Sequence, residues 1–320
     1  MTSPLSPSFR TTTDDANNIN ITRLAVTVTP PYSPSSQSKA VAEFPYRDSD
    51  IENLSEEEIA DACNAASKEI QFGIARIAQK TIVKFGGWVD LAEARNMEFV
   101  ARNAPSIRVP RVIRTFQNND KDGDSITYIV MEFIAGDPLS ECWNDMSKAR
   151  RENVCNQVID AITSLRAFEL QTVGPIGGKD HWDAPCVDLF SSHGTKAKSS
   201  IGDLERWYDF ALNWCKRIKN ARPEVPAFKD YFSSTLAMTH LDIAPRNIIV
   251  QEDDTICIID WEYAGAYPAY FERIALEKAR RKKEDKEFLD RVLERLPGYK
   301  EEIKHHLSVR MAMSTFVLPD

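Results

Sequence analysis

The sequence predicts an α+β protein in which a small β-sheet dominates the first half and helices dominate the second. Short runs rich in β-branched and aromatic residues follow one another up to about residue 133, which is typical of strands. After Gly136-Asp137-Pro138 the apolar residues recur mainly at three- and four-residue spacings, which is typical of helices that face a core. A chain of 320 residues is long enough for both parts to share a substantial core.

In the first half, residues 1–40 are rich in Ser, Thr, Pro and Asn and hold few large apolar side chains. Such a segment cannot bury enough surface to offset its ordering entropy, so we expect a disordered tail. Ser55 and Glu58 have the spacing of a capping box, which predicts a helix that runs to about Ser67. The elements expected next are strands at 70–77 and 81–85, a helix at 90–103, and strands at 111–116 and 125–133.

In the second half, a helix is predicted at 147–170, where Val154, Val158 and Ile162 share one stripe. Residues 171–202 are loop-rich, and helices are expected at 202–220 and within 270–310. One strand pair, at 248–250 and 256–259, interrupts this helical half. The division that follows is a tail (1–40), an N-terminal lobe (41–133) and a C-terminal lobe (134–320).

The formal net charge of −8 argues against a nucleic-acid partner, because phosphate binding needs a basic surface. An acidic protein is compatible with a cationic substrate. The six cysteines are scattered without a CxxC pair, so we expect free thiols. No apolar run reaches the roughly 18 residues that span a membrane, and the N-terminus does not resemble a secretory signal. We therefore expect a cytoplasmic protein without a membrane partner. Neither composition nor motif spacing predicts the oligomeric state.

The segment 239–262 carries the clearest chemical signal. Its two short apolar runs flank a polar turn, which predicts a hairpin with Asn247 before the first strand and Asp260 after the second. Antiparallel pairing brings both residues to the same open end, and Asp242 lies on the loop that leads in. Mg²⁺ prefers oxygen ligands, which suits Asn247 and Asp260. Asp242 then remains free to accept a proton from an attacking hydroxyl.

Two motifs resemble the aminoglycoside phosphotransferase and choline kinase group, especially its fungal branch. They are His-Leu-Asp-Ile-Ala-Pro-Arg-Asn at 240–247 and Ile-Asp-Trp-Glu at 259–262. This resemblance implies a bilobal protein-kinase-like fold with a small β-rich N-lobe and a larger helical C-lobe. It also implies an ATP-dependent enzyme that transfers the γ-phosphate to a small-molecule hydroxyl with the help of Mg²⁺. Asp242 would be the catalytic base, Asn247 and Asp260 the metal ligands, and His240 a structural brace.

The first half fits the same resemblance. Lys84 lies within an apolar strand, where it needs an anionic partner. In the family such a lysine contacts the α- and β-phosphates and pairs with a helix glutamate; Glu93 and Glu98 are both available, and the register of the next segment favours Glu93. The sequence YIVMEFIAG at 128–136 resembles the connector between lobes. This likeness implies that the backbone of the three residues Glu132, Phe133 and Ile134 holds the adenine.

Other assignments stay open. Arg246 would contact phosphate or pair with a nearby acid, and Glu262 is either a site residue or the first acid of a helix. The acceptor would lie among residues 171–220 and 262–275, which hold the aromatic residues Trp182, Trp207, Tyr208, Trp214, Tyr263 and Tyr267. These aromatic residues fit a pocket and a core equally well.

Three other functions compete with the small-molecule kinase. No GxGxxG motif is present, which leaves a catalytically inactive kinase-like binding protein as the alternative. A metal-dependent hydrolase built on His240, Asp242 and Asp260 would need further ligands nearby, and the sequence offers none. A protein kinase is disfavoured because Asp-Phe-Gly and Ala-Pro-Glu are absent.

Overall fold

The computed structural model describes residues 44–67, 72–119, 123–178, 200–217 and 236–315, all within one structural unit, Lys39–Asp320. The predicted tail at 1–40 and Trp182 lie outside the described residues. Within the described part of the chain, every helix is too short or too polar to cross a membrane.

The first half forms a four-stranded antiparallel sheet in the described residues. The strands lie in the order β1 (Phe72–Ala78), β2 (Thr81–Gly86), β4 (Ser125–Glu132) and β3 (Val112–Asn119). Only the residues Gln79 and Lys80 separate β1 from β2, as expected for a hairpin. These bounds agree with the predicted strands to within a few residues.

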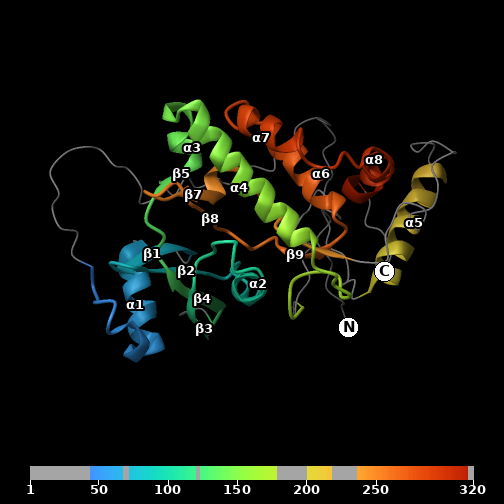
Figure 1. The fold of residues 1–320 in the computed structure, drawn as a ribbon. Helices are drawn as coiled ribbons and strands as arrows, with labels where there is room; N and C mark the ends of the chain where they lie inside the picture. The colour runs from blue at the N-terminus through green and yellow to red at the C-terminus, as the bar shows by residue number, and fades with distance from the viewer. Residues whose placement is uncertain (1–43, 68–71, 120–122, 179–199, 218–235, 316–320) are drawn as a thin grey trace, which may run out of the picture. The chain divides into compact units, whose positions relative to one another are not determined.

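A helix covers each face of this sheet (Figure 1). Alternation along β2 turns Val83 toward α1 (Glu56–Ser67) and Lys84 toward the other side. The predicted capping box starts α1, because the backbone N–H of Glu58 donates to Ser55 Oγ at 3.2 Å and Ser55 N–H donates to the Glu58 carboxylate at 2.8 Å. On the opposite face α2 (Leu91–Asn103) packs Met97 and Val100 into the main core. Lys84 therefore lies on the face that α2 covers.

The second half is mainly helical, which confirms the predicted α+β class. Its longest helix, α4, buries the predicted stripe of Val154, Val158 and Ile162 in the main core. The other helices pack around it and onto a second apolar cluster between α5 and α6. The α-helices of this half in the described residues are α3 (Leu139–Cys142), α4 (Lys148–Arg166), α5 (Ile201–Arg217), α6 (Tyr270–Ala279), α7 (Lys286–Leu293) and α8 (Lys300–Thr315).

The expectation of a single strand pair in this half is wrong. The predicted hairpin is present as β7 (Ile248–Val250) and β8 (Ile256–Ile258), but β5 (Asp137–Pro138) also pairs with β7. In addition, β6 (Ala237–Thr239) pairs with β9 (Gly265–Tyr267). Strands of two or three residues are too short to show an alternating pattern, so only their tertiary partners define them.

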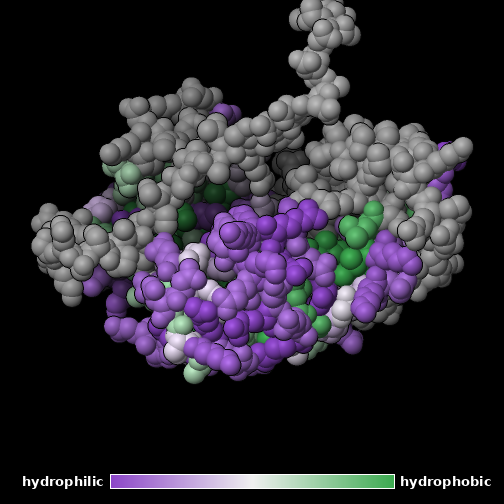
Figure 2. All heavy atoms as spheres, turned by 90° about the horizontal axis from the view of Figure 1, so that it is seen from above, coloured by the Kyte–Doolittle hydropathy of each residue, from purple (hydrophilic) through white to green (hydrophobic). Residues whose placement is uncertain are grey.

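Figure 2 shows that the described surface on the side of α3 and α7 is mainly hydrophilic, with apolar side chains grouped in hollows between polar ones. Amphipathic helices account for this surface. In α7, for example, Phe288, Leu289 and Val292 are buried, while Lys286 and Glu287 are exposed.

We expect Ile59→Ala to lower the free energy of unfolding by about 2–5 kcal/mol. Ile59 is fully buried between α1 and the outer face of the sheet, where the truncated side chain leaves a cavity. Urea unfolding monitored by tryptophan fluorescence measures the loss. Glu57→Ala, on the exposed side of the same helix, is the control and should change stability by less than about 0.5 kcal/mol. Equal losses in the two variants would contradict the packing of α1 on the sheet.

Candidate active site

The hairpin of β7 and β8 brings Asn247 and Asp260 to one end. Asn247 precedes β7, Asp260 follows β8, and the backbone N–H of Ile259 donates to the Asn247 carbonyl at 3.0 Å. Asp242 reaches the same place from the loop after β6. The side-chain Nδ2 of Asn247 donates to its carboxylate at 2.8 Å and to its carbonyl at 2.9 Å. The structure thus brings together the three residues that the sequence pattern grouped.

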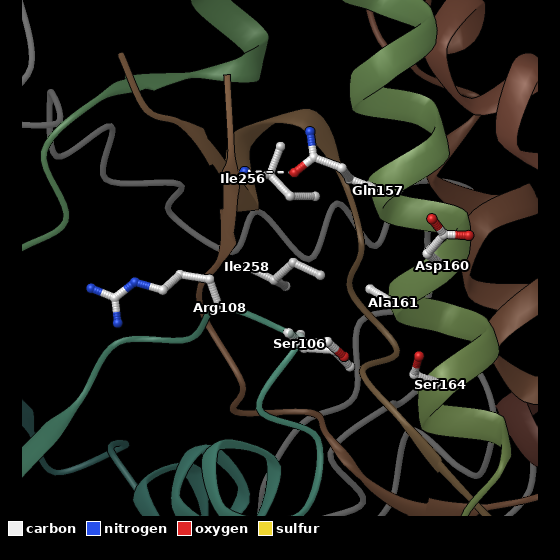
Figure 3. Close-up of a pocket in the computed structure, with 9 residues that line it drawn as sticks. Ser106, Arg108, Gln157, Asp160, Ala161, Ser164, Ile256 and Ile258 are labelled. Carbon is white, nitrogen blue, oxygen red and sulfur yellow. Dashed lines mark hydrogen bonds between the residues drawn. The ribbon is translucent and has the colours of Figure 1, made fainter. Parts of the chain in front are cut away.

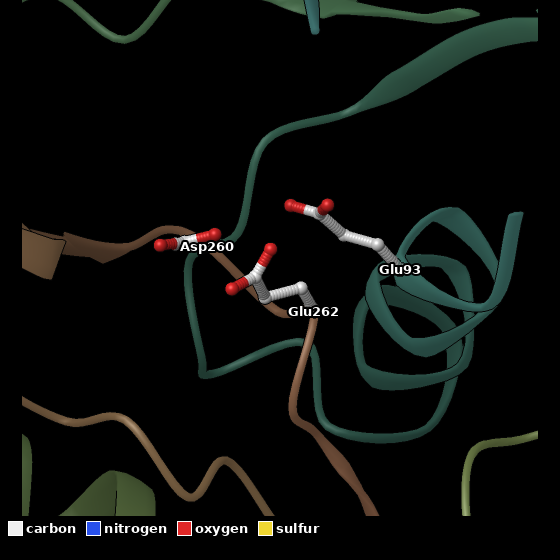
Figure 4. Close-up of side chains that lie close together, drawn as sticks. All are labelled: Glu93, Asp260 and Glu262. Atoms are coloured by element: carbon white, nitrogen blue, oxygen red, sulfur yellow. The ribbon is translucent and has the colours of Figure 1, made fainter. Parts of the chain in front are cut away.

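Lys84 joins this end of the hairpin to the sheet. Its Nζ lies 2.8 Å from Glu93 Oε2, 2.7 Å from Asp260 Oδ1 and 3.5 Å from Glu262 Oε2. Glu93 comes from the first turn of α2, and Asp260 and Glu262 come from the segment after β8; their carboxylates point toward one another (Figure 4). The alternative partner, Glu98, is exposed on another face of α2. Of the two glutamates that the spacing offered, the structure pairs Glu93 with Lys84.

Each charged group in this cluster shifts the pKa values of the others. Burial alone would lower the pKa of Lys84, but the three carboxylates hold it well above its ordinary value. Burial raises the pKa of Glu93 to about 7, although the ammonium of Lys84 acts in the opposite direction. Burial also acts to raise the pKa of Asp260, but Lys84 outweighs it and the pKa lies below its ordinary value. Asp260 therefore ionises more readily than Glu93.

Asp242 is held by two side chains. Nη2 of Arg246 lies 2.6 Å from each of its carboxylate oxygens, and Asn247 Nδ2 donates to Oδ2. Burial raises the pKa of Asp242, with Arg246 and Asn247 acting against it. An ionised carboxylate offers about four acceptor positions; Arg246 uses two and Asn247 uses one. One acceptor position on Asp242 therefore remains for an incoming donor.

His240 stabilises the loop that carries Asp242. It is fully buried, and its ring packs edge-on against Trp261 with 4.6 Å between centroids. The backbone N–H of Asp242 donates to Nδ1 at 3.2 Å, which leaves Nε2 to donate to the carbonyl of Ile259 at 3.1 Å. Burial lowers the pKa of His240, so the ring stays neutral and keeps this pair of bonds. The loop and the end of β8 are thereby joined through one ring.

Leu241 adopts a left-handed backbone conformation, with φ of 63°. This conformation costs a non-glycine residue roughly 1–2 kcal/mol. The buried carboxylate of Glu272, on α6, accepts the N–H groups of His240 at 2.7 Å and of Leu241 at 3.1 Å. The Leu241 side chain is itself buried in the second apolar cluster with Tyr267 and Phe271, which offsets the strain.

The backbone of the connector is partly used inside the protein. The N–H of Glu132 donates to the carbonyl of Arg111 at 2.9 Å, and the N–H of Phe133 donates to the carbonyl of Lys80 at 2.8 Å. The Glu132 carboxylate forms an ion pair with Arg108. Neither of these two N–H groups is available to a ligand in this structure, so any backbone donor for a base must come from farther along the connector.

An apolar cluster lies beneath the connector. Ile134, Ile249 and Cys257 are buried against one another. On the sheet, Ile74 pairs in register with Lys84 and thus shares its face, yet nearly half of its surface (48%) is exposed. Ile74 and the apolar cluster at Ile134 therefore offer apolar surface for a planar base, next to the charged groups around Lys84.

The donor set suits a divalent cation with few protein ligands. Because Asn247 donates from Nδ2 to Asp242, its Oδ1 is left without a hydrogen-bond partner among the described residues. Asp260 and Glu262 add carboxylate oxygens. Glu93, Asp260 and Glu262 can each place an oxygen within 4.8 Å of the other two, and the ammonium of Lys84 lies at this cluster. Oxygen ligands of this kind fit Mg²⁺.

Two site residues were missed or left open at the sequence level. Glu262 does not begin a helix, because α6 starts at Tyr270; it belongs to the cluster instead. Its spacing of two residues from Asp260 was the available signal. Glu272 had no local signal, because its partners lie more than thirty residues earlier in the chain.

The aromatic residues of the expected acceptor region belong mainly to the core. Trp207, Tyr208 and Tyr267 are buried in the second apolar cluster, and Tyr263 is partly buried beside it. The side chain of Trp214 lies outside the described residues. Trp207, Tyr208 and Tyr267 therefore help to pack α5 and β9 against α6.

A family model described as the phosphotransferase enzyme family matches residues 91–302. No curated protein sequence matches the chain. Among solved structures, an apo thermostable mutant of aminoglycoside phosphotransferase APH(4)-Ia is 15% identical over 75% of this chain and 80% of its own, with a TM-score of 0.47. The gentamicin complex of APH(2")-IIa is 16% identical over 81% and 86%, with a TM-score of 0.46.

We expect Lys84→Met to lower stability more at high pH than at low pH. Because the pKa of Glu93 in the folded protein is raised to about 7 from 4.5, the folded state holds the proton longer than the unfolded state, and stability falls as pH rises through this window. Removing the ammonium leaves Glu93 buried without its cation, so its pKa rises further. Urea unfolding should show a loss of about 3–5 kcal/mol at pH 8.5 and a smaller loss at pH 5.5.

The matched control is Lys84→Met combined with Glu93→Gln, which removes both buried charges. Its stability should depend on pH less than that of Lys84→Met alone. A loss that is the same at both pH values in Lys84→Met would show that the uncompensated charge of Glu93 is not its cause.

We expect Leu241→Gly to be less destabilising than Leu241→Ala, by about 1 kcal/mol. Both variants lose the buried side chain, but only glycine relieves the left-handed conformation. Leu204, buried within α5, is the control position; there glycine should be worse than alanine by about 0.5–1 kcal/mol. The same order of stability at both positions, measured by urea unfolding, would argue against strain at Leu241.

Proposed function

Because this chain belongs to the phosphotransferase enzyme family, we propose that it transfers the γ-phosphate of ATP to a hydroxyl of a small molecule. The observation that carries the proposal is the meeting of two groups from distant parts of the chain. Lys84 of the sheet, paired with Glu93 of α2, contacts Asp260, which lies at the same hairpin end as Asp242 and Asn247. Phosphoryl transfer depends mainly on positioning and charge neutralisation, and this set offers a cation, an anionic metal ligand and a base.

The nucleotide would lie between the sheet and the β7–β8 hairpin. Its base would contact the apolar surface of Ile134 and Ile74 beside Glu132 and Phe133 of the connector. Its phosphates would interact with Lys84, whose buried partner Glu93 holds the ammonium in place. Family membership supports the kinase-like fold on which this arrangement depends.

Asn247 and Asp260 would hold Mg²⁺, and Glu262 is close enough to Asp260 to assist. When bound, the ion neutralises the phosphate charge that develops during transfer. The free Oδ1 of Asn247 and the lowered pKa of Asp260 support this role, because both provide an unprotonated oxygen at neutral pH.

Asp242 would act as the base. The acceptor hydroxyl would donate to its remaining acceptor position, its oxygen would attack the γ-phosphorus as the bond to ADP breaks, and its proton would pass to the carboxylate. The raised pKa of Asp242 suits a proton acceptor. Arg246 stays bound to Asp242 or turns toward the phosphates; its exposed guanidinium, with 44% of the side chain accessible, supports the second position as reachable.

We expect Asp260→Asn to lower the rate of Mg²⁺-dependent ATP turnover by about a hundredfold or more, because a charge at the phosphate site is lost. Asp242→Asn should lower kcat by about 10²–10⁴-fold while leaving nucleotide binding intact. The measurements are ADP release with a panel of amino sugars, amino alcohols and neutral polyols, and a thermal-shift titration with ATP and Mg²⁺.

Asp253→Asn is the matched control, since it makes the same change in the exposed turn of the same hairpin. It should leave turnover unchanged. If the wild-type protein shows a Mg²⁺-dependent thermal shift but no turnover with any acceptor, the alternative of a catalytically inactive kinase-like binding protein gains support. If neither ATP binding nor turnover is found at millimolar ATP, the proposed function is wrong.

A further inference from the structure

A second pocket, of about 200 Å³, lies between α4, the loop from α2 to β3, and β8 (Figure 3). It is separate from the cluster at Lys84. Side chains alternate along β8, so Ile256 and Ile258 face this pocket while Cys257 faces the apolar cluster beneath the connector. The pocket and the candidate nucleotide surface are thus on opposite faces of the same strand.

The floor of the pocket is apolar. Ile107, Ala161, Ile256 and Ile258 line it, and each is no more than 7% exposed. The walls are already fixed to one another, because the N–H of Ile258 donates to the carbonyl of Arg108 at 3.0 Å. A small apolar group could therefore be bound here without rearrangement of the backbone.

Three polar side chains on the rim are exposed or partly buried and have no protein partner among the described residues. The side chains of Ser106, Asp160 and Ser164 form no hydrogen bond or ion pair within the described part of the chain, although all three line the pocket. Gln157 differs, since its Oε1 accepts from Ile256 N–H at 3.1 Å and its Nε2 donates to the Asp254 carbonyl at 2.8 Å. The three groups come from the α2–β3 loop and from α4, and they line the same pocket.

The charge at this opening is negative. The other charged lining residue, Arg108, is paired with Glu132, and its guanidinium points away from the remaining lining side chains (Figure 3). The carboxylate of Asp160 thus has no cation facing it among the lining residues. A ligand that brings a positive charge would exchange the water on these exposed groups for an ion pair and charge-assisted hydrogen bonds.

We propose that this pocket is a second binding site, for a small aliphatic amine. The hydrocarbon part lies on the isoleucine floor, and the ammonium group interacts with Asp160 and the hydroxyls of Ser106 and Ser164. The volume is below the roughly 300–1,000 Å³ of sites for drug-sized ligands, so the amine has a single ring or short chain. The site does not depend on the proposed phosphotransfer, because it uses none of its residues.

The test is a titration of the full chain, labelled at isoleucine δ1-methyl groups, with cyclohexylamine and with its neutral counterpart cyclohexanol. The amine should give saturable NMR shifts at Ile107, Ile256 and Ile258 and none at Ile74, which belongs to the candidate nucleotide surface beside Lys84. Cyclohexanol should bind about three- to fivefold more weakly, the range expected for loss of one exposed ion pair.

Two variants and one control locate the amine. Asp160→Asn should weaken cyclohexylamine binding by the same three- to fivefold, and Ser164→Phe, which fills the opening, should remove it. Glu98→Gln, which changes the net charge equally on an exposed face of α2, should have no effect. Unchanged spectra elsewhere show that each variant is folded.

Equal affinity for the amine and the alcohol, or binding that survives both pocket variants, would overturn the proposal. So would loss of cyclohexylamine binding in Asp260→Asn or on addition of ATP and Mg²⁺, because the amine would then be bound at the candidate active site. Retained binding under both conditions, with the shifts confined to the pocket isoleucines, supports a separate site even if the phosphotransferase proposal fails.

Discussion

The ammonium of Lys84 is the interaction on which the arrangement of the candidate site depends. It lies within 3.5 Å of three carboxylates, of which Glu93 is almost fully buried. A buried carboxylate without a cation is strongly unfavourable, so Glu93 and Lys84 require each other. Because Asp260 lies 176 residues after Lys84 along the chain, the same ammonium also fixes the segment after β8 against the sheet.

A second constraint acts on the loop that carries Asp242. Its backbone turns through a left-handed residue, Leu241, and its N–H groups are bound by Glu272 from α6. His240 ties the same loop to Ile259 at the end of β8. Two elements, α6 and the end of β8, thus hold a short loop in a conformation that it would not adopt alone. Strain of this kind persists only where the surrounding contacts over-determine the backbone, and it is concentrated at functional sites.

The Lys84 cluster and the anchored loop together explain why the candidate site is rigid and yet keeps oxygen atoms that are free to bind a ligand. Lys84 is paired with Glu93, and both ring nitrogens of His240 are bonded inside the protein. Among the described residues, by contrast, Asn247 keeps a free oxygen and Asp242 keeps one acceptor position. Chemistry in which charge is neutralised and a hydroxyl is oriented needs such unfilled positions on groups that do not move. The second pocket has the same property on the far side of β8, where an apolar floor is rimmed by unpaired polar groups.

The sequence by itself determined the features that depend on neighbours along the chain. The capping box at Ser55, the β7–β8 hairpin and the convergence of Asp242, Asn247 and Asp260 lie within windows of about twenty residues or fewer, where turn length and strand alternation limit the geometry. The pairing of Lys84 with Glu93 was predictable for the same reason, since β2 leads directly into α2. The roles assigned to these residues stay predictions.

Only the tertiary structure decided the remainder. The anchoring of the loop by Glu272, the place of Glu262, the short strands β5, β6 and β9, and the second pocket all depend on contacts between segments far apart in sequence. Such contacts arise from the packing of whole elements against one another, and two or three residues of local sequence do not encode them. The loop shows this most clearly: leucine at position 241 has no local preference for a left-handed turn, and it is held there by a helix that begins almost thirty residues later.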